Sequence, residues 1–441
     1  MTLSMVGLIG GLALLIVLTI RGMNILLAAP LCALLVAVTS GIPLMPPLAA
    51  EGAESLTTGY MLGFSGFLQD WFIVFLLGAM FGKVMEDSGA ADSVAHWVVE
   101  KLGIRHAALA IIAACAILTY GGISVFVVAF SVFPMALSLF KRANLPRRFI
   151  PAALAFGSVT FTMTSAGSVE IQNFIPIKYL GTTQFAGWQV SLVVALFMAT
   201  TGIWWFKYMM KRALAKGECF DVREGDPEEI DYSALPHPLL AVIPLALVLA
   251  TSFYFSMVLD FGKSALTIAL LVGLSAGIGI YWERFHKLDD TLSVASLGAL
   301  VAIANTCAVV GFGSIAKLTP AFHEALVTMT SIPGNELIGA AVAVSVIAGM
   351  TGSASGGQAI ALPLIAPGYL EAGVNPDALH RVVAITSGGL DSLPHNGYVV
   401  TTIRAICGET HKSAYLPVAA LTVVIPFVGT ILAIILFIMG L

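Results

Sequence analysis

Charged residues are scarce in this sequence. Lys, Arg, Asp and Glu account for 10% of the 441 residues, whereas hydrophobic residues account for 58%. A soluble domain carries about 25% charged residues, so this chain has too few to cover a water-exposed surface. This shortage excludes a soluble enzyme, a nucleic-acid-binding protein and a secreted domain held together by disulfides.

Metal, nucleotide and redox motifs are missing as well. The five cysteines are scattered without a C-x-x-C pair, so neither a zinc knuckle nor a disulfide framework is indicated. There is no P-loop, no H-E-x-x-H and no G-x-G-x-x-G after a plausible strand. The run GLSAG at 273–277 matches the nucleophile elbow, but it lies within an apolar segment and is better explained as small-residue helix packing. The sequence predicts neither an enzyme nor an ATP-driven pump, and no cofactor or metal.

Long apolar runs are what the sequence has in abundance. Several reach the roughly 20 residues that a helix needs to cross a bilayer. The first starts near the N-terminus with no basic flank, which favours a retained span over a removed signal peptide. We therefore expect an all-α polytopic protein embedded in a lipid bilayer. The predicted helices are 3–20, 23–42, 70–85, 106–119, 124–140, 148–180, 187–210, 237–256, 264–283, 289–315, 336–350, 357–370, 380–407 and 414–440.

One long hydrophilic stretch divides the chain. Residues 211–236 are rich in charged side chains and separate two parts of nearly equal length. Near-equal halves suggest an internal repeat. The sequence predicts a first repeat at 1–212, a linker loop at 213–236 and a second repeat at 237–441.

Each half contains the same succession of short segments. A hairpin-like pair lies at 106–140 in the first half and at 336–370 in the second, and in both a serine precedes a proline by ten residues. Each pair is followed by a helix interrupted near its middle, at 148–180 and at 380–407. Because sequence identity between the halves is low, this spacing is the evidence for a repeat.

The distribution of basic residues indicates how the halves are oriented. With the linker in the cytoplasm and both hairpins re-entrant, only Lys178, Lys263, Lys317 and Arg381 of the 21 Lys and Arg residues lie outside, as the positive-inside rule favours. The first hairpin then enters from the cytoplasm and the second from outside, so the repeats have inverted topologies. The alternative is that each hairpin forms two full spans, although arms of about 14–17 residues are short for a span.

The interrupted helices point to transport. Unwound backbone at bilayer depth is tolerated only where protein or a water-filled cavity satisfies its N–H and C=O groups. Two such breaks in inverted halves indicate the substrate site of a secondary transporter, because half-helix N-termini attract anions. Polar breaks are expected at 164–168 and 394–398. No Lys or Arg stands at either break in the sequence, so helix dipoles and neutral donors would have to hold an anion.

Polar residues and glycines at the hairpin tips and breaks form the candidate site, although such residues also serve as packing residues in membrane helices. Asp391 and His395 lie inside an apolar segment, where an ionised Asp costs about 2.5–3.5 kcal/mol, so either could carry a coupled proton. Glu170 is expected near the outer surface as a structural or solvated residue. The candidate substrate-binding residues are Gly122, Ser124, Thr164, Ser165, Gly167, Asn173, Ser353, Ser355, Gly356, His395 and Asn396.

Three segments resemble the gluconate:proton symporter (GntP) family. They are GGISVFVV at 121–128, LFKRANLPRRFIPAALAFGSVTFTMTSAGSVEIQNFIPIKYLGT at 139–182 and FLLGAMFGKVMEDSGAA at 75–91. The resemblance covers nearly the whole chain. It implies a 12-element inverted-repeat fold of the ion transporter superfamily and uptake of small hydroxy- or sugar-acid anions with protons. It also implies a homodimer in a bacterial-type inner membrane that works by an elevator motion.

Two differences from the gluconate permeases indicate which branch of the family this chain resembles. Those permeases carry a Pro-Gly-Thr-Pro-like run in the first broken helix, where this chain has AGSV at 166–169. In the second break they tend toward Ser-His-x-Asn-Asp, where this chain has SLPHNG at 392–397. The run GGLDSLPHNG at 388–397 is more similar to the D-β-hydroxybutyrate permease branch. This similarity favours a short, less polar hydroxycarboxylate over a polyhydroxy sugar acid.

The sequence and the resemblance together predict a carrier that imports a small hydroxycarboxylate, such as 3-hydroxybutyrate, with protons. A gluconate or sugar-acid symporter is one alternative. A carboxylate carrier coupled to Na⁺ is another, because Asp, Ser and backbone carbonyls also form sodium sites. A passive anion channel is more distant, since its polar residues would form a continuous stripe and not gather at the breaks.

Overall fold

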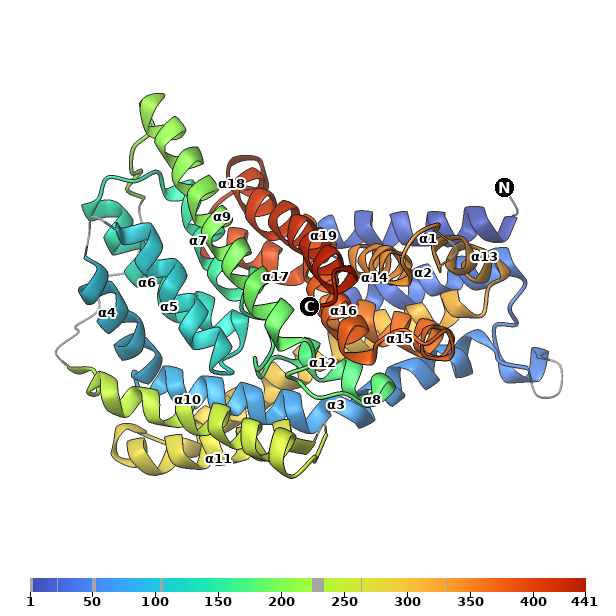
Figure 1. Ribbon diagram of the computed structural model, residues 1–441, viewed down its shortest axis with the longest axis horizontal. Helices are drawn as coiled ribbons and strands as arrows, with labels where there is room; N and C mark the ends of the chain where they lie inside the picture. The colour runs from blue at the N-terminus through green and yellow to red at the C-terminus, as the bar shows by residue number, and fades with distance from the viewer. Residues whose placement is uncertain are drawn as a thin grey trace.

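The computed structural model describes residues 3–21, 23–49, 53–103, 106–223, 234–262, 264–330 and 332–441. Within these ranges all regular secondary structure is helical (Figure 1). Seven helices of the described part are long and apolar enough to cross a bilayer. The prediction of an all-α polytopic membrane protein is therefore confirmed.

The polar linker separates two groups of helices in the described part of the chain. The first half holds α1 (Leu3–Ile20), α2 (Ile25–Ser40), α3 (Leu56–Asp87), α4 (Ala90–Leu102), α5 (Ala107–Tyr120), α6 (Val125–Arg142), α7 (Ile150–Ala155), α8 (Ile175–Leu180) and α9 (Trp188–Ala215). The second half holds α10 (Pro238–Phe253), α11 (Ser264–Tyr281), α12 (Leu288–Lys317), α13 (Pro320–Thr330), α14 (Glu336–Thr351), α15 (Ala354–Glu371), α16 (Pro376–Leu390), α17 (Gly397–Val400), α18 (His411–Ala419) and α19 (Ile425–Ile438).

Some predicted helix limits were wrong. Helix α3 starts at Leu56 and not at residue 70, because Ser55 and Thr58 form a capping box well before the apolar run. Helices α4 and α13 were missed, since they are only 13 and 11 residues long and carry polar side chains. Helix α9 continues to Ala215, so the linker starts later than residue 213; residues 224–233 of the linker lie outside the described ranges.

Helices α3 and α12 form a long antiparallel pair at the centre of the fold. At one end Thr291 Oγ1 donates to Asp87 Oδ2 at 2.7 Å, and toward the other end Tyr60 donates to the carbonyl of Ala308 at 3.1 Å. Glycines allow the close approach: a Cβ on Gly63 would lie 2.0 Å from Ser314 Oγ. The pair forms a spine on which the other helices pack.

Contacts between the halves come in matching pairs. Helices α1 and α2 pack together and α2 contacts α12, just as α10 and α11 pack together and α11 contacts α3. In the same way α4 contacts α10, and α13 contacts α1. In Figure 1 the α10–α11 pair and the α1–α2 pair accordingly lie toward opposite ends of the molecule, with α9 and α19 side by side between them.

Two helical hairpins, α5–α6 and α14–α15, lie on opposite sides of this central region (Figure 1). Arm α6 packs on the helical turns after the second break, and arm α15 packs on α8 after the first break. Each hairpin therefore reaches across to the broken helix of the other half.

The first broken helix lacks regular α-helix over a longer stretch than predicted. Helix α7 continues as a π-helix to Thr160, and α-helix resumes only at Ile175. Side chains donate hydrogen bonds to backbone carbonyls that the unwound helix leaves without their usual partners. The Thr162 hydroxyl donates to the carbonyls of Gly157 and Ser158, and Asn173 Nδ2 donates to the carbonyl of Met163. The expected break at 164–168 is thus only the middle of the unwound segment.

The second broken helix unwinds earlier than predicted. Helix α16 ends at Leu390, and α17 begins at Gly397, so the break spans 391–396 in place of 394–398. The side chain of Asn396 accepts the N–H of Val399 at 2.8 Å. This N-cap starts the new helix immediately after Asn396, which makes the two following residues helical.

Candidate functional site

The second hairpin tip lies directly against the second break. Asn396 Nδ2 donates to the carbonyl of Gly352 at 3.0 Å, while its Oδ1 caps α17. Gly352 adopts a left-handed conformation with φ of +59°, and a Cβ there would lie 2.8 Å from Cδ2 of His395. Glycine is therefore required at this tip for two reasons: a side chain would strain the left-handed backbone, and it would overlap His395.

The first turn of α15 gathers three predicted residues of the second tip. The Ser353 hydroxyl accepts the N–H of Gly356 at 3.1 Å and lies 3.3 Å from the Ser355 hydroxyl. This N-terminus begins a helix of 18 residues. The positive end of its helix dipole favours an anion.

A buried carboxyl group stands beside this helix N-terminus. Asp391 is 6% exposed, accepts a hydrogen bond from the Ser392 hydroxyl at 3.1 Å and interacts with the backbone of Ala354. In the described part of the chain, two buried polar atoms close by have no hydrogen-bond partner, Nε2 of His395 and Oε1 of Gln358. The second tip and break therefore bring Asp391, His395 and the end of α15 together.

Asn173 organises the first break. Its Nδ2 donates to the carbonyls of Met163 and Ser168, which lie on either side of the unwound turn. Gly167, with φ of +82°, donates its N–H to the carbonyl of Gln184 at 3.1 Å. The Ser165 hydroxyl donates to the carbonyl of Phe161, so it is satisfied by its own segment.

The first hairpin tip has a less polar environment than the second. Gly122 has φ of +95°, and a Cβ there would lie 2.6 Å from Cγ2 of Val169 in the first break. Ser124 precedes α6 and is half-buried, but its side chain makes no capping hydrogen bond. This tip is thus held against its break by apolar contact.

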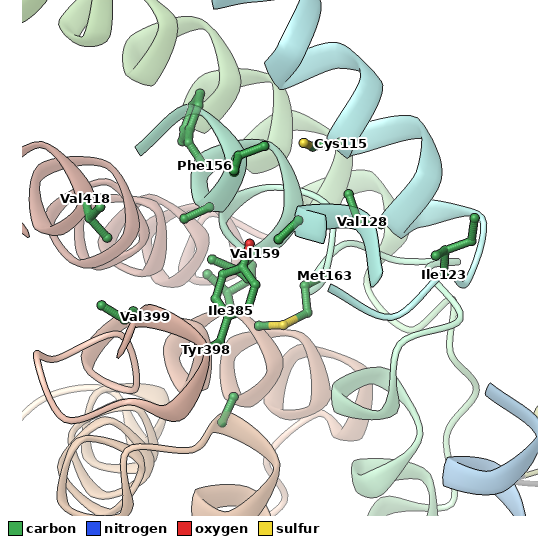
Figure 2. Close-up of a cluster of buried hydrophobic side chains, with 14 of the residues drawn as sticks. Cys115, Ile123, Val128, Phe156, Val159, Met163, Ile385, Tyr398, Val399 and Val418 are labelled. Carbon is green, nitrogen blue, oxygen red and sulfur yellow. The ribbon is translucent and has the colours of Figure 1, made fainter. Parts of the chain in front are cut away.

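The space between the two breaks is filled by hydrophobic side chains. Figure 2 shows Met163 of the first break, and Ile385 and Tyr398 from either side of the second break, within one buried cluster. The first break also packs closely on α16, since a Cβ on Gly388 would lie 3.0 Å from the side-chain atom Cγ2 of Thr164. Each tip therefore meets the break of its own half, and the two breaks meet through apolar packing.

The expectation that no Lys or Arg lies at a break was wrong. Arg381 of α16 is 0% exposed and reaches the first break. Its Nη1 donates to the Thr164 carbonyl and to Asn173 Oδ1, both at 2.7 Å, and its Nε and Nη2 donate to the carbonyls of Ala186 and Gln184 at 2.9 and 3.0 Å. Sequence reasoning missed it because Arg381 is more than 200 residues from Thr164. The only available signal was a basic residue near an apolar segment.

Glu170 lies within the first break. Its N–H contacts the Ser168 hydroxyl at 3.4 Å. It immediately precedes the short 3₁₀ helix Ile171–Asn173 and is half-buried. The longer unwound segment places it there.

A groove of about 720 Å³ opens beside the first break. Its walls come from α5, the first break, α9 and α10, and most of them are apolar. Tyr120 lines it and donates to the carbonyl of Ala166 at 2.8 Å, and Ser191 accepts the N–H of Ala166 at the same distance. The groove is thus an apolar space with a polar strip along the unwound backbone.

Comparisons with known proteins agree with this architecture. A family model described as GntP family permease matches residues 1–280. The chain is 36% identical to an uncharacterized transporter, YxjC, of Bacillus subtilis over 92% of each chain. It is 25% identical to an uncharacterized transporter of Haemophilus influenzae over 80% of this chain and 79% of that one. It is 31% identical to a high-affinity gluconate transporter of Escherichia coli, but only over 35% of this chain and 33% of that one.

Two solved structures share the fold. The YdaH transporter of Alcanivorax borkumensis superposes with a TM-score of 0.57 at 14% identity, covering 97% of this chain and 99% of the other. MtrF of Neisseria gonorrhoeae superposes with a TM-score of 0.53 at 15% identity, covering 94% of each. The family match, the full-length relative and the helical bundle with its interrupted helices lead to one conclusion: the chain belongs to the GntP family of permeases and is a multi-pass membrane transporter, not an enzyme.

Proposed function

We propose that this permease is a secondary active transporter that imports a small hydroxycarboxylate anion together with protons. The observation that carries this proposal is the meeting of the second hairpin tip with the second break, where Asn396 bonds Gly352. There the positive N-terminal end of α15 would attract a carboxylate, and the buried Asp391 stands beside it. A carrier needs such a pair, one group for the anion and one for the coupled proton.

The proposed substrate is a short hydroxycarboxylate such as 3-hydroxybutyrate. Serine and amide groups at the second tip suit one hydroxyl and one carboxylate, and the wall between the breaks is apolar around Met163 and Tyr398. A long polyhydroxy chain would have fewer partners there. Gluconate or another sugar acid is the second candidate, because the chain shares one segment with a gluconate transporter.

The proposed mechanism is alternating access between inverted repeats. The matching contacts of the halves and the opposed hairpins support inverted repeats, at 1–212 and 237–441, with re-entrant hairpins. In an elevator motion, α3 and α12 with the α1–α2 and α10–α11 pairs would stay fixed while hairpins and broken helices move as one body. We further propose a homodimer in a bacterial-type inner membrane, as the family resemblance implies.

Proton coupling sets an energetic expectation. One net positive charge moved inward across 100 mV provides about 2.3 kcal/mol, which supports roughly a fifty-fold substrate gradient. Na⁺ coupling is the alternative, because Asp391 and the Ser392 hydroxyl could also take part in a sodium site. A passive anion channel would concentrate nothing.

Transport by purified protein in liposomes tests this proposal. Counterflow is measured with 3-hydroxybutyrate, gluconate and citrate, and accumulation is then driven by an imposed pH gradient with or without Na⁺. We expect saturable counterflow of 3-hydroxybutyrate and accumulation that follows the pH gradient. Uptake that requires Na⁺ and ignores the pH gradient would support the sodium alternative. Absence of counterflow for every hydroxy acid would refute the proposal.

A further inference from the structure

Arg381 is a buried positive charge that no acidic side chain balances by contact. In the described part of the chain, no ion pair involves Arg381, and its hydrogen bonds go to three backbone carbonyls and one side-chain amide. The acidic residue in the first turn of the same helix, Asp377, is exposed; it interacts electrostatically with Arg381 but makes no hydrogen bond or ion pair with it. Arg147 provides a contrast, because this other buried arginine faces the Glu409 carboxylate, with Nε 3.8 Å from Oε1.

Backbone bracing alone does not explain this choice of residue. An arginine offers five N–H donors and so can hold several carbonyls that an unwound helix leaves without partners. A charge buried in the protein interior nevertheless carries a large desolvation cost unless an opposite charge approaches. An ionisable residue in such a position is expected to have a partner, and for Arg381 the described residues supply none by direct contact.

An anion bound in the groove beside the first break would lie near the Arg381 guanidinium. Arg381 bonds the carbonyls of Thr164, Gln184 and Ala186. The residues next to these along the chain, Ser165 and Phe185, line the groove. The guanidinium therefore lies directly behind the groove wall, in surroundings of low dielectric constant where its field is weakly screened.

Two buried polar groups without hydrogen-bond partners lie next to Arg381. The Thr164 hydroxyl, on a residue that is 1% exposed, has no hydrogen-bond partner in the described part of the chain, and neither has Nε2 of the buried Gln184. Both residues give their carbonyls to Arg381. Tyr120 of the groove wall is also close enough to interact electrostatically with Arg381.

We propose that Arg381 is the specificity-determining residue that selects an anion at the first break, through the charge it holds behind the groove wall. This inference rests on the proposed function, because it concerns the same carboxylate substrate. It adds, to the site at the second tip, a positive charge that the substrate would meet at the first break. The apolar walls of the groove, including Trp188 and Phe253, would take the aliphatic part of the molecule. The ligand class is thus a small monocarboxylate with an apolar portion.

The test compares an acid with its uncharged amide. Binding of 3-hydroxybutyrate and of 3-hydroxybutyramide, and likewise of gluconate and gluconamide, is measured on full-length purified protein. In Arg381→Gln we expect acid binding to weaken at least tenfold while amide binding changes less than twofold. Arg381→Lys keeps the charge and should keep the preference for the acid. Arg147→Gln, which removes a buried arginine that has its own carboxylate, should leave the acid-to-amide ratio unchanged.

Several results would overturn the proposal. If Arg381→Gln weakens binding of the acid and of the amide equally, Arg381 only holds the backbone of the break in place. If Arg381→Gln does not fold, Arg381→Lys decides: loss of the preference for the acid in that variant refutes charge selection. Failure of the proposed function is distinguishable, because the wild-type protein would then show no counterflow of any hydroxy acid.

Discussion

Asn396 and Gly352 are joined by a hydrogen bond of 3.0 Å from the Asn396 side-chain amide to the Gly352 carbonyl. The bond links the second broken helix to the tip of the second hairpin, 44 residues away in the sequence. The same side chain caps α17 through its other atom, Oδ1. One amide thereby fixes both the start of a helix and the position of the tip.

Replacing Asn396 by Ser should separate these two roles. Serine can still cap α17, but it is too short to reach the Gly352 carbonyl, so we expect transport to fall about tenfold with a loss of stability of about 1 kcal/mol. Transport is measured by counterflow and stability by thermal unfolding in detergent. The control is Asn335→Ser, which changes an N-cap at the outer end of the same hairpin. Equal transport by the two variants would contradict the importance of the tip contact.

Gly352→Ala should destabilise the second tip more than the left-handed backbone alone explains. An alanine with positive φ costs about 1–2 kcal/mol, and its Cβ would also overlap the His395 ring at 2.8 Å, which adds about 1–3 kcal/mol. Gly373→Ala is the matched control, since Gly373 has φ of +81° but open space around it. The difference between the two melting temperatures measures the overlap. Identical losses would mean that the tip moves freely away from His395.

Asp391→Asn should uncouple transport from the proton gradient. An amide keeps the size and polarity of the side chain but cannot carry the proton, so counterflow should persist while uphill accumulation disappears. The assay is accumulation under an imposed pH gradient. Asp377→Asn, which changes an exposed residue in the first turn of α16, should accumulate substrate normally. Full accumulation by Asp391→Asn would exclude Asp391 as the proton carrier and shift attention to His395.

The pair formed by Arg148 and Glu218 should make stability depend on pH. Arg148 donates to both carboxylate oxygens, at 2.6 and 3.0 Å, and this hydrogen bonding lowers the pKa of Glu218 from its usual 4.5. Because the pKa is lower in the folded state, the stabilisation is complete above about pH 4.5 and is lost as the pH falls through the folded value. The pair is partly exposed, so the effect is at most about 1 kcal/mol.

The measurement for this pair is the melting temperature of wild type and Glu218→Gln across the acidic range. The two should differ at pH 6 and converge as the pH falls below the folded-state pKa of Glu218. Arg148→Gln should have the same effect, and combining both changes should add little, since both variants remove one interaction. A difference that stays constant with pH would show that the ion pair is not its source.

Composition and spacing predicted much of the architecture. An apolar run of sufficient length forms a helix in a bilayer wherever it stands, because no other conformation satisfies its backbone there. The hairpins and interrupted helices were therefore visible from Gly, Pro and Ser inside apolar segments. Their limits were less predictable, since local caps such as Ser55 and Asn396 set them.

Residues distant in the sequence came together only through tertiary packing. Asn173 shapes the first break, but its partner Arg381 belongs to the other half of the chain. Short amphipathic helices such as α4 were missed for a related reason: they are stabilised by what they pack against and not by length.

The sequence alone determined that this protein is a helical membrane protein and that it unwinds twice within apolar helices, because these properties depend on local composition. Tertiary structure decided which break each tip meets and where the buried charge lies. A guanidinium stabilises whichever carbonyls surround it in space, and no spacing along the chain specifies those neighbours.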